Sequence, residues 1–164
     1  MKSLDAPGGA IARWWRRLSR LPYGRTLFSI IIGRMAPYTG TAGARVEELR
    51  PGYARWRLGD RRRVRNHLRS IHAVALVNLA EVTSGTAMLM ALPPGVRGIV
   101  TRISIEYLKK ARGTITAVCQ CALPPIEQET ELDVHAELRD AANDVVARAT
   151  VTWRLSAHAP PPVQ

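Results

Sequence analysis

The sequence is poor in cysteine, phenylalanine and acidic residues, and the shortage of cysteine already excludes two classes of protein. Its 164 residues include two cysteines, too few for a disulfide framework and, without a nearby histidine pair, for a structural zinc site. Cys119 and Cys121 lie two positions apart in a strand-like stretch, so both side chains point to one face and are not expected to bridge. We therefore expect no metal and no oxidising compartment.

Acidic residues are outnumbered, 13 against 24 lysines and arginines, which gives a formal net charge of +11. Such a surface favours an anionic partner, and nucleic acid, a membrane surface and coenzyme A would all be attracted. The basic residues are scattered, however, and the single phenylalanine leaves little to stack on bases. Nucleic acid is therefore the least favoured partner, and we expect none.

A long apolar run is also missing near the N-terminus. The stretch from Leu27 to Ile32 is far shorter than the roughly 20 residues that span a bilayer. Arg34 and Pro37 follow it without a cleavage pattern, so it is a poor signal peptide. We expect a cytoplasmic protein, with peripheral membrane contact through residues 11–36 as an alternative. The tryptophans and arginines at 14–17 would then lie on the membrane, although we favour their capping the open end of the sheet.

Apolar residues make up 46% of the chain and charged residues 23%, which is typical of one compact domain. We place that domain at residues 41–156. A helical extension of one or two helices precedes it over 1–40, and a disordered proline-rich tail follows over 157–164.

The hydrophobic pattern predicts strands, one buried helix and then more strands. Alternating residues predict a hairpin around Pro51-Gly52, and a segment from Ile71 to about Met90, apolar on nearly every side, predicts a core helix. Four further alternating runs follow, at 99–107, 114–121, 132–139 and 145–154, which we interpret as a four-strand meander. This order indicates an α+β hotdog fold, a curled antiparallel sheet of five to six strands around one long central helix.

Glu81 lies inside the predicted core helix, where burying an ionised carboxylate is costly. A functional role is favoured over a wet helix edge or an ion pair with Arg102. His72 is nine positions earlier, which corresponds to about 900° of rotation and roughly 13 Å of rise. The two residues therefore lie on opposite faces, and a joint site needs two chains. We expect a homodimer or a dimer of dimers.

The segment from Asn66 through His72 to Glu81 resembles the active-site segment of hotdog-fold thioesterases of the phenylacetate-pathway type. It is more similar still to a group of uncharacterised bacterial hotdog proteins known as a domain of unknown function. The turn at 107–113 resembles the end of the third strand in the same superfamily, and the resemblance covers about residues 41–155. The sequence departs from the thioesterases at Ala73 and Val74, where they usually carry two glycines.

The resemblance implies a set of catalytic roles. Backbone N–H groups near His72 and Ala73 would polarise the thioester carbonyl, as helix N-termini favour developing negative charge. Glu81 of the partner chain would act as nucleophile or general base, and Asn66 would hold the carbonyl or a water. Ser84, one turn beyond Glu81, would orient the carboxylate.

Basic residues in the third strand and in the turn after it would bind the phosphates of coenzyme A. The candidates are Lys109, Lys110, Arg112 and Arg102. For the turn residues the competing interpretation is a basic turn that serves solubility alone.

The predicted function is therefore hydrolysis of an acyl-CoA or acyl-carrier thioester, with coenzyme A entering as part of the substrate and no other cofactor. A hydratase or dehydratase is less favoured because the His-Phe-Pro-Gly segment of the dehydratases is absent. The serious alternative is a non-catalytic hotdog protein that binds acyl thioesters or lipids, which the missing glycines make plausible.

Overall fold

The structure, a computed structural model, describes residues 7–157. The first six residues and most of the predicted proline-rich tail, 158–164, lie outside the described residues. Three helices precede the sheet: α1 (Pro7–Leu18), α2 (Gly24–Met35) and α3 (Pro37–Ala42). The expectation of one or two helices in this region therefore missed the short α3, which begins at a proline, a residue suited to the first turn of a helix.

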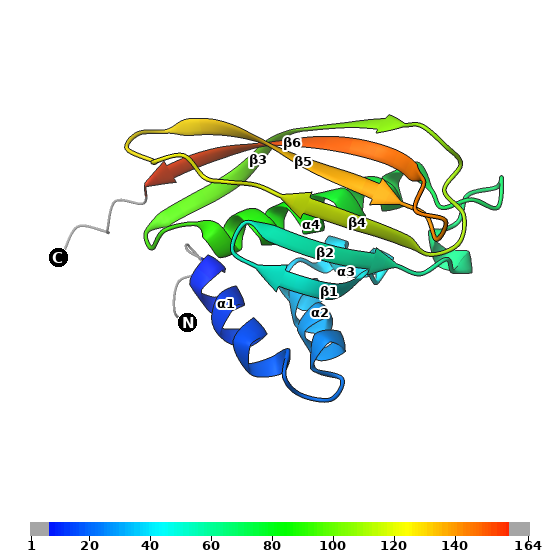
Figure 1. Cartoon of the computed structure of the whole chain (residues 1–164), viewed down its shortest axis with the longest axis horizontal. Helices are drawn as coiled ribbons and strands as arrows, with labels where there is room; N and C mark the ends of the chain where they lie inside the picture. Colours follow the sequence, from blue (N-terminus) through cyan, green and yellow to red (C-terminus); the bar gives the residue numbers. More distant parts are fainter. Residues whose placement is uncertain (1–6, 158–164) are drawn as a thin grey trace.

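Six antiparallel strands form one sheet that curls around the long helix α4 (Ala73–Ala91), as Figure 1 shows. The strands are β1 (Arg45–Arg50), β2 (Tyr53–Leu58), β3 (Val96–Tyr107), β4 (Ile115–Gln120), β5 (Thr130–Arg139) and β6 (Val145–Ala157). Their order in the sheet is β1-β2-β4-β5-β6-β3. The predicted hotdog arrangement of one central helix and a curled sheet is confirmed.

The prediction of a four-strand meander is wrong in one respect. β3 does not pair with β4, which follows it in the chain, but with β6, from Val96 opposite Ala157 to Tyr107 opposite Ala147. Alternation along a strand reports which side chains face the core and carries no information about the neighbouring strand. β3 and β1 are consequently the two edges of the sheet.

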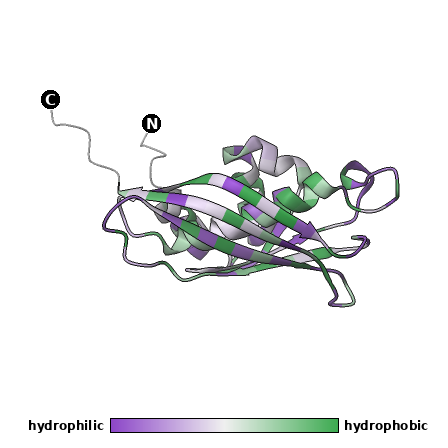
Figure 2. Cartoon of the chain, turned by 90° about the horizontal axis from the view of Figure 1, so that it is seen from above, coloured by the Kyte–Doolittle hydropathy of each residue, from purple (hydrophilic) through white to green (hydrophobic). Residues whose placement is uncertain are grey.

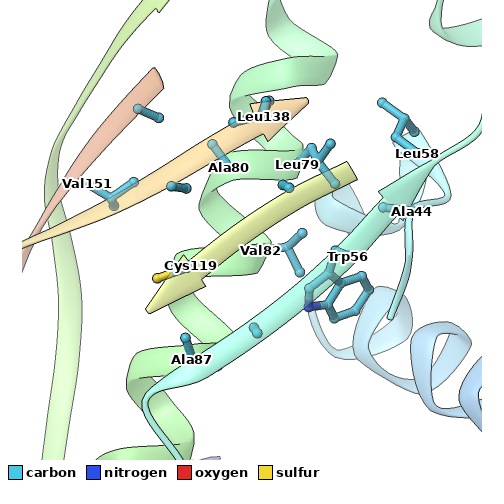
Figure 3. Packing of buried hydrophobic residues seen from close by; sticks show 14 of the residues in the cluster. Ala44, Trp56, Leu58, Leu79, Ala80, Val82, Ala87, Cys119, Leu138 and Val151 are labelled. Atoms are coloured by element: carbon cyan, nitrogen blue, oxygen red, sulfur yellow. The ribbon is translucent and has the colours of Figure 1, made fainter. Parts of the chain in front are cut away.

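Helix α4 is the core of the molecule. Leu79, Ala80 and Met88 have no exposed surface, and side chains of β2, β4, β5 and β6 meet the helix in Figure 3. Trp56 of β2 fixes the register between sheet and helix, because its Nε1 donates a hydrogen bond of 2.9 Å to Thr86 Oγ1. By length and composition α4 could cross a membrane, but 61% of its apolar window is buried inside this fold.

The strands alternate as the sequence predicted. Figure 2 shows apolar and polar bands along them, and in β6 Val151 and Leu155 are fully buried while Arg154 is exposed. The burial of one face and exposure of the other fixes the register of each strand.

The N-terminal helices cover the side of α4 that the sheet leaves open. Phe28 of α2 is completely buried, and the ring of Trp15 meets it edge to face with centroids 5.2 Å apart. α1 approaches the end of α4 closely at Gly8, where a Cβ atom would collide with the carbonyl of Leu89. Of the tryptophan pair, Trp15 thus packs inward and Trp14 is exposed.

Candidate functional site

The N-terminus of α4 begins at His72, which caps the helix with its own side chain. The ring Nδ1 of His72 accepts a hydrogen bond of 3.1 Å from the backbone N–H of Val74. The backbone N–H of His72 donates a hydrogen bond of 2.8 Å to the carbonyl of Val64. Of the backbone N–H groups expected near His72 and Ala73, the one of His72 is thus already bonded within the chain. Within residues 7–157, the N–H of Ala73 is the one near this helix start that has no acceptor.

Asn66 shapes the loop before the helix. Its Oδ1 accepts hydrogen bonds from the N–H groups of Leu68 and Ser70 and from the hydroxyl of Ser70, at 3.0, 3.3 and 3.1 Å. The carbonyl end of the amide is thus occupied by the loop. Its Nδ2 is the group that can still donate a hydrogen bond to a substrate carbonyl.

Glu81 lies half-buried on α4 and lines a cavity of about 300 Å³. The walls come from all three N-terminal helices, from α4 and from β6, and include Ile11, Ile32, Met35, Leu89 and Trp153. Burial raises the pKa of the Glu81 carboxyl, and no nearby cation offsets the desolvation. The carboxylate is therefore kept in an apolar setting without a charge partner among the described residues.

Ser84 lies one turn beyond Glu81, as predicted, but its hydroxyl does not orient the carboxylate. It donates a hydrogen bond of 3.1 Å to the main-chain carbonyl of Glu81, and Ser84 is completely buried. Serine in a helix commonly bonds back to the preceding turn in this way.

His72 and Glu81 line separate pockets of one chain. His72 lies beside Tyr38, Val74 and Asn78, whereas the cavity of Glu81 opens farther along the helix. A single chain thus does not unite the two, consistent with the nine-residue separation.

The connection from β3 to β4 lies against the start of α4. Buried Ala111 accepts a hydrogen bond of 2.8 Å from the N–H of Ile71, which places exposed Lys110 and Arg112 beside the helix N-terminus. Lys109 has another role, because its ammonium pairs with Asp140 at 2.8 Å and Asp144 at 2.6 Å. Those hydrogen bonds raise the pKa of Lys109 and hold the turn between β5 and β6.

Arg102 lies away from all of these groups. It lines a shallow groove with Glu131, Asp133 and Thr152, on the face of the sheet opposite to α4. Neither an ion pair with Glu81 nor a phosphate site near the helix start is compatible with this position. The bulge in β3 between Val100 and Arg102 shifts which residues face outward, which simple alternation could not predict.

Most of the chain matches a known protein family. Residues 24–155 match the family described as "Domain of unknown function (DUF4442)". This chain belongs to that family. The match begins at the first residue of α2, so α2 and α3 fall within the DUF4442 region and α1 precedes it. No curated protein matches the chain.

Solved structures share the DUF4442 chain's fold. A structural-genomics crystal structure labelled APC5556 is 32% identical, with a TM-score of 0.79, over 90% of this chain and 99% of its own. A Pseudomonas aeruginosa protein of unknown function, described as a probable thioesterase, is 24% identical, with a TM-score of 0.73, over 84% and 97%. A Haemophilus influenzae thioesterase is 13% identical, with a TM-score of 0.69, over 80% and 92%. This DUF4442 protein therefore shares its fold with solved structures that include proteins described as thioesterases.

Two residues near the candidate groups were not singled out from the sequence. Tyr107 donates from its hydroxyl to the carbonyl of Ala73 at 3.1 Å, and Trp153 has a buried Nε1 with no acceptor among residues 7–157. The alternation of Ile103, Ile105 and Tyr107 would have placed the tyrosine on the helix-facing side of β3. For Trp153, no sequence signal indicates that it shares a cavity with Glu81.

Proposed function

We propose that this DUF4442 protein hydrolyses acyl thioesters, carried by coenzyme A or by an acyl-carrier protein, in the cytoplasm. The observation that carries the proposal is Glu81, a carboxylate on the core helix that faces a cavity of about 300 Å³ with mainly apolar walls. Carboxyl groups with raised pKa values in apolar clefts are enriched at reaction centres. The thioesterases among the structures of similar fold favour this chemistry.

The reaction requires a base and a group that stabilises negative charge. Glu81 accepts a proton from water as the water oxygen attacks the thioester carbonyl, or attacks that carbonyl itself. The Ala73 N–H and the Asn66 Nδ2 stabilise the oxyanion, and collapse of the tetrahedral species breaks the C–S bond. In the general-base route, protonated Glu81 then passes its proton to the departing thiolate, which leaves a carboxylic acid and a thiol. In the nucleophilic route, loss of the thiolate leaves a mixed anhydride on Glu81. Water hydrolyses that anhydride to the acid and protonated Glu81, which then gives its proton to the thiolate.

The proposed site takes Glu81 from one chain and the helix start from another, and the edge strand β3 is the surface that suits such a dimer. Among the strands of the described residues, β3 has a partner along one side only, which is β6. Ile103 and Tyr107 on its helix-facing side are exposed, although large apolar side chains next to an open strand edge are usually covered. Pairing of β3 with the partner's β3 would extend the sheet and bury them.

Lys110 and Arg112 are the residues proposed to bind the phosphates of coenzyme A. They are exposed, take part in no ion pair within residues 7–157, and flank Ala111, which is anchored beside the helix start. In coenzyme A the pantetheine arm separates the phosphates from the thioester, so the proposal places the phosphates on this exposed connection and the thioester carbonyl at the Ala73 N–H. Lys109 is excluded from this role because two aspartates already hold its ammonium.

A panel of short, long and aromatic acyl-CoAs, with thiol release monitored, tests the proposal. We expect turnover of at least one member and loss of that turnover in Glu81→Gln. Glu106→Gln, a matched change on the exposed outer side of β3, should keep full activity. Full activity in Glu81→Gln would refute the mechanism.

A second candidate function is binding of acyl thioesters without turnover. The hydrogen bonds at the start of α4 favour this candidate. The Val64 carbonyl accepts from the His72 N–H and the His72 ring accepts from the Val74 N–H, so within the described chain only the Ala73 N–H there has no acceptor. Exposed Val74 also stands where the thioesterases usually have glycine. Tight binding of an acyl-CoA by the intact protein, with no thiol released, would favour this candidate.

A further inference from the structure

The N-terminal part of the chain has a charge distribution unlike the rest. Between residues 6 and 46 there are seven arginines and no aspartate or glutamate. Six of them lie on α1, on α2 and on the link between these helices, and all six are exposed: Arg13, Arg16, Arg17, Arg20, Arg25 and Arg34. A surface of one sign attracts a partner of the opposite sign.

The outer face of α2 is apolar although it faces solvent. Leu27 and Ile30 are 47% and 46% exposed, and Tyr23, just before the helix, is 88% exposed. These residues are four and three positions apart and lie on one helix face, while Phe28 and Ile32 on the opposite face are buried in the core. The exposed face is therefore a defined apolar stripe on a well-anchored helix.

α2 is firmly held, so the stripe is a fixed feature. Ser29 Oγ accepts a hydrogen bond of 3.0 Å from the N–H of Val46 and so covers part of the open edge of β1. Tyr23 adopts a left-handed backbone conformation, with φ of 59°, which is unfavourable for a residue with a Cβ atom. Helices α1 and α2 form a helical hairpin, and Figure 1 shows that the link between them is the part of it farthest from the sheet.

The stripe continues into a pocket that contains four arginines. Ile30 and Arg34 line it from α2, and Arg45, Arg61 and Arg63 contribute to its wall. Its volume is about 630 Å³, and none of the lining residues within 7–157 is acidic. Arg61 donates hydrogen bonds of 3.2 and 2.7 Å to the carbonyls of Ala42 and Gly43 and is thereby fixed in place.

The positive charges in the arginine pocket lie close enough to one another to favour a bound anion. Burial and the nearby positive charges of Arg63 and Arg45 lower the pKa of Arg61, which means that the cluster repels itself. The two acidic residues nearest to these arginines along the chain pair elsewhere, Glu47 with Arg55 and Arg57, and Asp60 with Arg65. A bound phosphate would relieve the repulsion and accept bidentate hydrogen bonds.

We propose that this surface, the apolar stripe Tyr23–Leu27–Ile30 with the adjoining pocket of Arg34, Arg45, Arg61 and Arg63, docks on an anionic phospholipid membrane. The apolar side chains enter the interfacial region, the exposed arginines lie at the level of the headgroups, and the pocket binds a headgroup phosphate. Apolar residues flanked by arginine, with tyrosine at the boundary, are the composition of interfacial helices. The surface is at the β1 edge of the sheet, opposite the β3 edge, so it stays free in the proposed dimer.

Vesicle flotation with the full chain tests the proposal. We expect the protein to float with vesicles of phosphatidylcholine containing about one third phosphatidylglycerol, and not with pure phosphatidylcholine. Leu27→Asp combined with Ile30→Asp should abolish flotation, whereas Leu68→Asp, at a leucine that is 50% exposed and lies outside the stripe and the pocket, should not. Circular dichroism and a thermal melt establish that each variant is folded.

A second pair of variants separates the pocket from general positive charge. Arg34→Gln with Arg63→Gln should weaken vesicle binding by about fivefold for each arginine. Arg97→Gln with Arg154→Gln removes the same charge from β3 and β6 and should have little effect. Equal weakening by both pairs would refute a phosphate site in the pocket.

Three results would overturn the proposal. The first is failure of the intact protein to float with the anionic vesicles. The second is conversion of a larger oligomer to a smaller one by the Leu27 and Ile30 changes in vesicle-free sedimentation, which would make the stripe a contact between copies. The third is unchanged flotation of that variant together with full competition by a short DNA duplex, which would indicate a nucleic-acid surface.

Discussion

Glu81 and Trp153 line the same cavity, and neither has a polar partner there: the carboxylate lacks a cation, and the buried indole N–H lacks an acceptor among the described residues. A buried N–H without an acceptor and a partly desolvated carboxylate at one apolar cavity both carry a free-energy cost that folding alone does not require. A ligand with both a donor and an acceptor would remove that cost. This relationship is the main reason for placing the reaction at Glu81.

The pH dependence of hydrolysis should follow the Glu81 carboxyl. Because burial raises its pKa, kcat/KM should rise with pH through a midpoint above the ordinary glutamate value of about 4.3. Glu81→Gln should reduce kcat by about 100-fold or more, the usual contribution of a general base. Rates measured across pH with one acyl-CoA check this, and a profile unchanged in Glu81→Gln would contradict it.

The same residue should reduce stability at neutral pH. With the folded pKa raised, the unfolded chain releases its proton first as pH rises, so the free energy of unfolding falls between about pH 4.3 and the folded pKa. Glu81→Gln should therefore be more stable than the wild type at pH 8, by on the order of 1 kcal/mol. The difference should vanish near pH 4. Denaturant unfolding at both pH values measures it, and a destabilised variant at pH 8 would contradict the prediction.

If the proposed dimer forms through β3, substitutions of two isoleucines of that strand should have opposite results. Ile103 faces the helix side of β3 and Ile99 the outer side. Ile103→Arg should give a monomer by sedimentation and lose activity with it, because each proposed site needs two chains. Ile99→Arg should leave the oligomeric state and the activity unchanged, because Ile99 is 61% exposed and Ile103 37%. An active Ile103→Arg monomer would exclude a shared site.

Removal of the two basic residues of the β3–β4 connection should affect coenzyme A substrates selectively. Lys110→Ala with Arg112→Ala should raise KM about tenfold for an acyl-CoA and leave kcat nearly unchanged, since phosphate binding is made equally in ground and transition states. A short acyl thioester without phosphates provides the comparison and should show no change. Lys109→Ala should leave KM unaltered because that ammonium is held by Asp140 and Asp144.

Gly85 offers a test of the cavity as the acyl pocket. A Cβ atom at this position would lie 3.1 Å from Cζ2 of Trp153, so Gly85→Ala pushes the indole and narrows the cavity. The variant should shift preference toward shorter acyl chains. Its stability should stay near the wild type, since alanine gains about 1 kcal/mol of helix propensity that offsets the crowding. Gly9→Ala on α1, where the nearest contact is an ordinary 3.6 Å, is the matched control.

Periodicity and burial cost were sufficient to predict the central helix, the alternating strands and the unusual position of Glu81. They act over a few residues, and the sequence displays them directly. The pairing of β3 with β6, the bulge before Arg102 and the engagement of Lys109 depend on residues about 30 to 60 positions apart. The hydrogen bond of Ser84 was missed for another reason, because a hydroxyl in a helix has the main chain as a closer alternative to any side chain.

The cavity of Glu81 is walled in part by Ile11, which belongs to a helix that lies before the DUF4442 match. The proposed reactive group, Glu81, and this part of the cavity wall thus belong to two different helices, α4 and α1. Replacement of α1, or of the side chains that it contributes to the cavity, should change the size of the cavity and leave Glu81 on α4 unchanged. Such variants offer a route to a protein with altered selectivity for acyl-chain length.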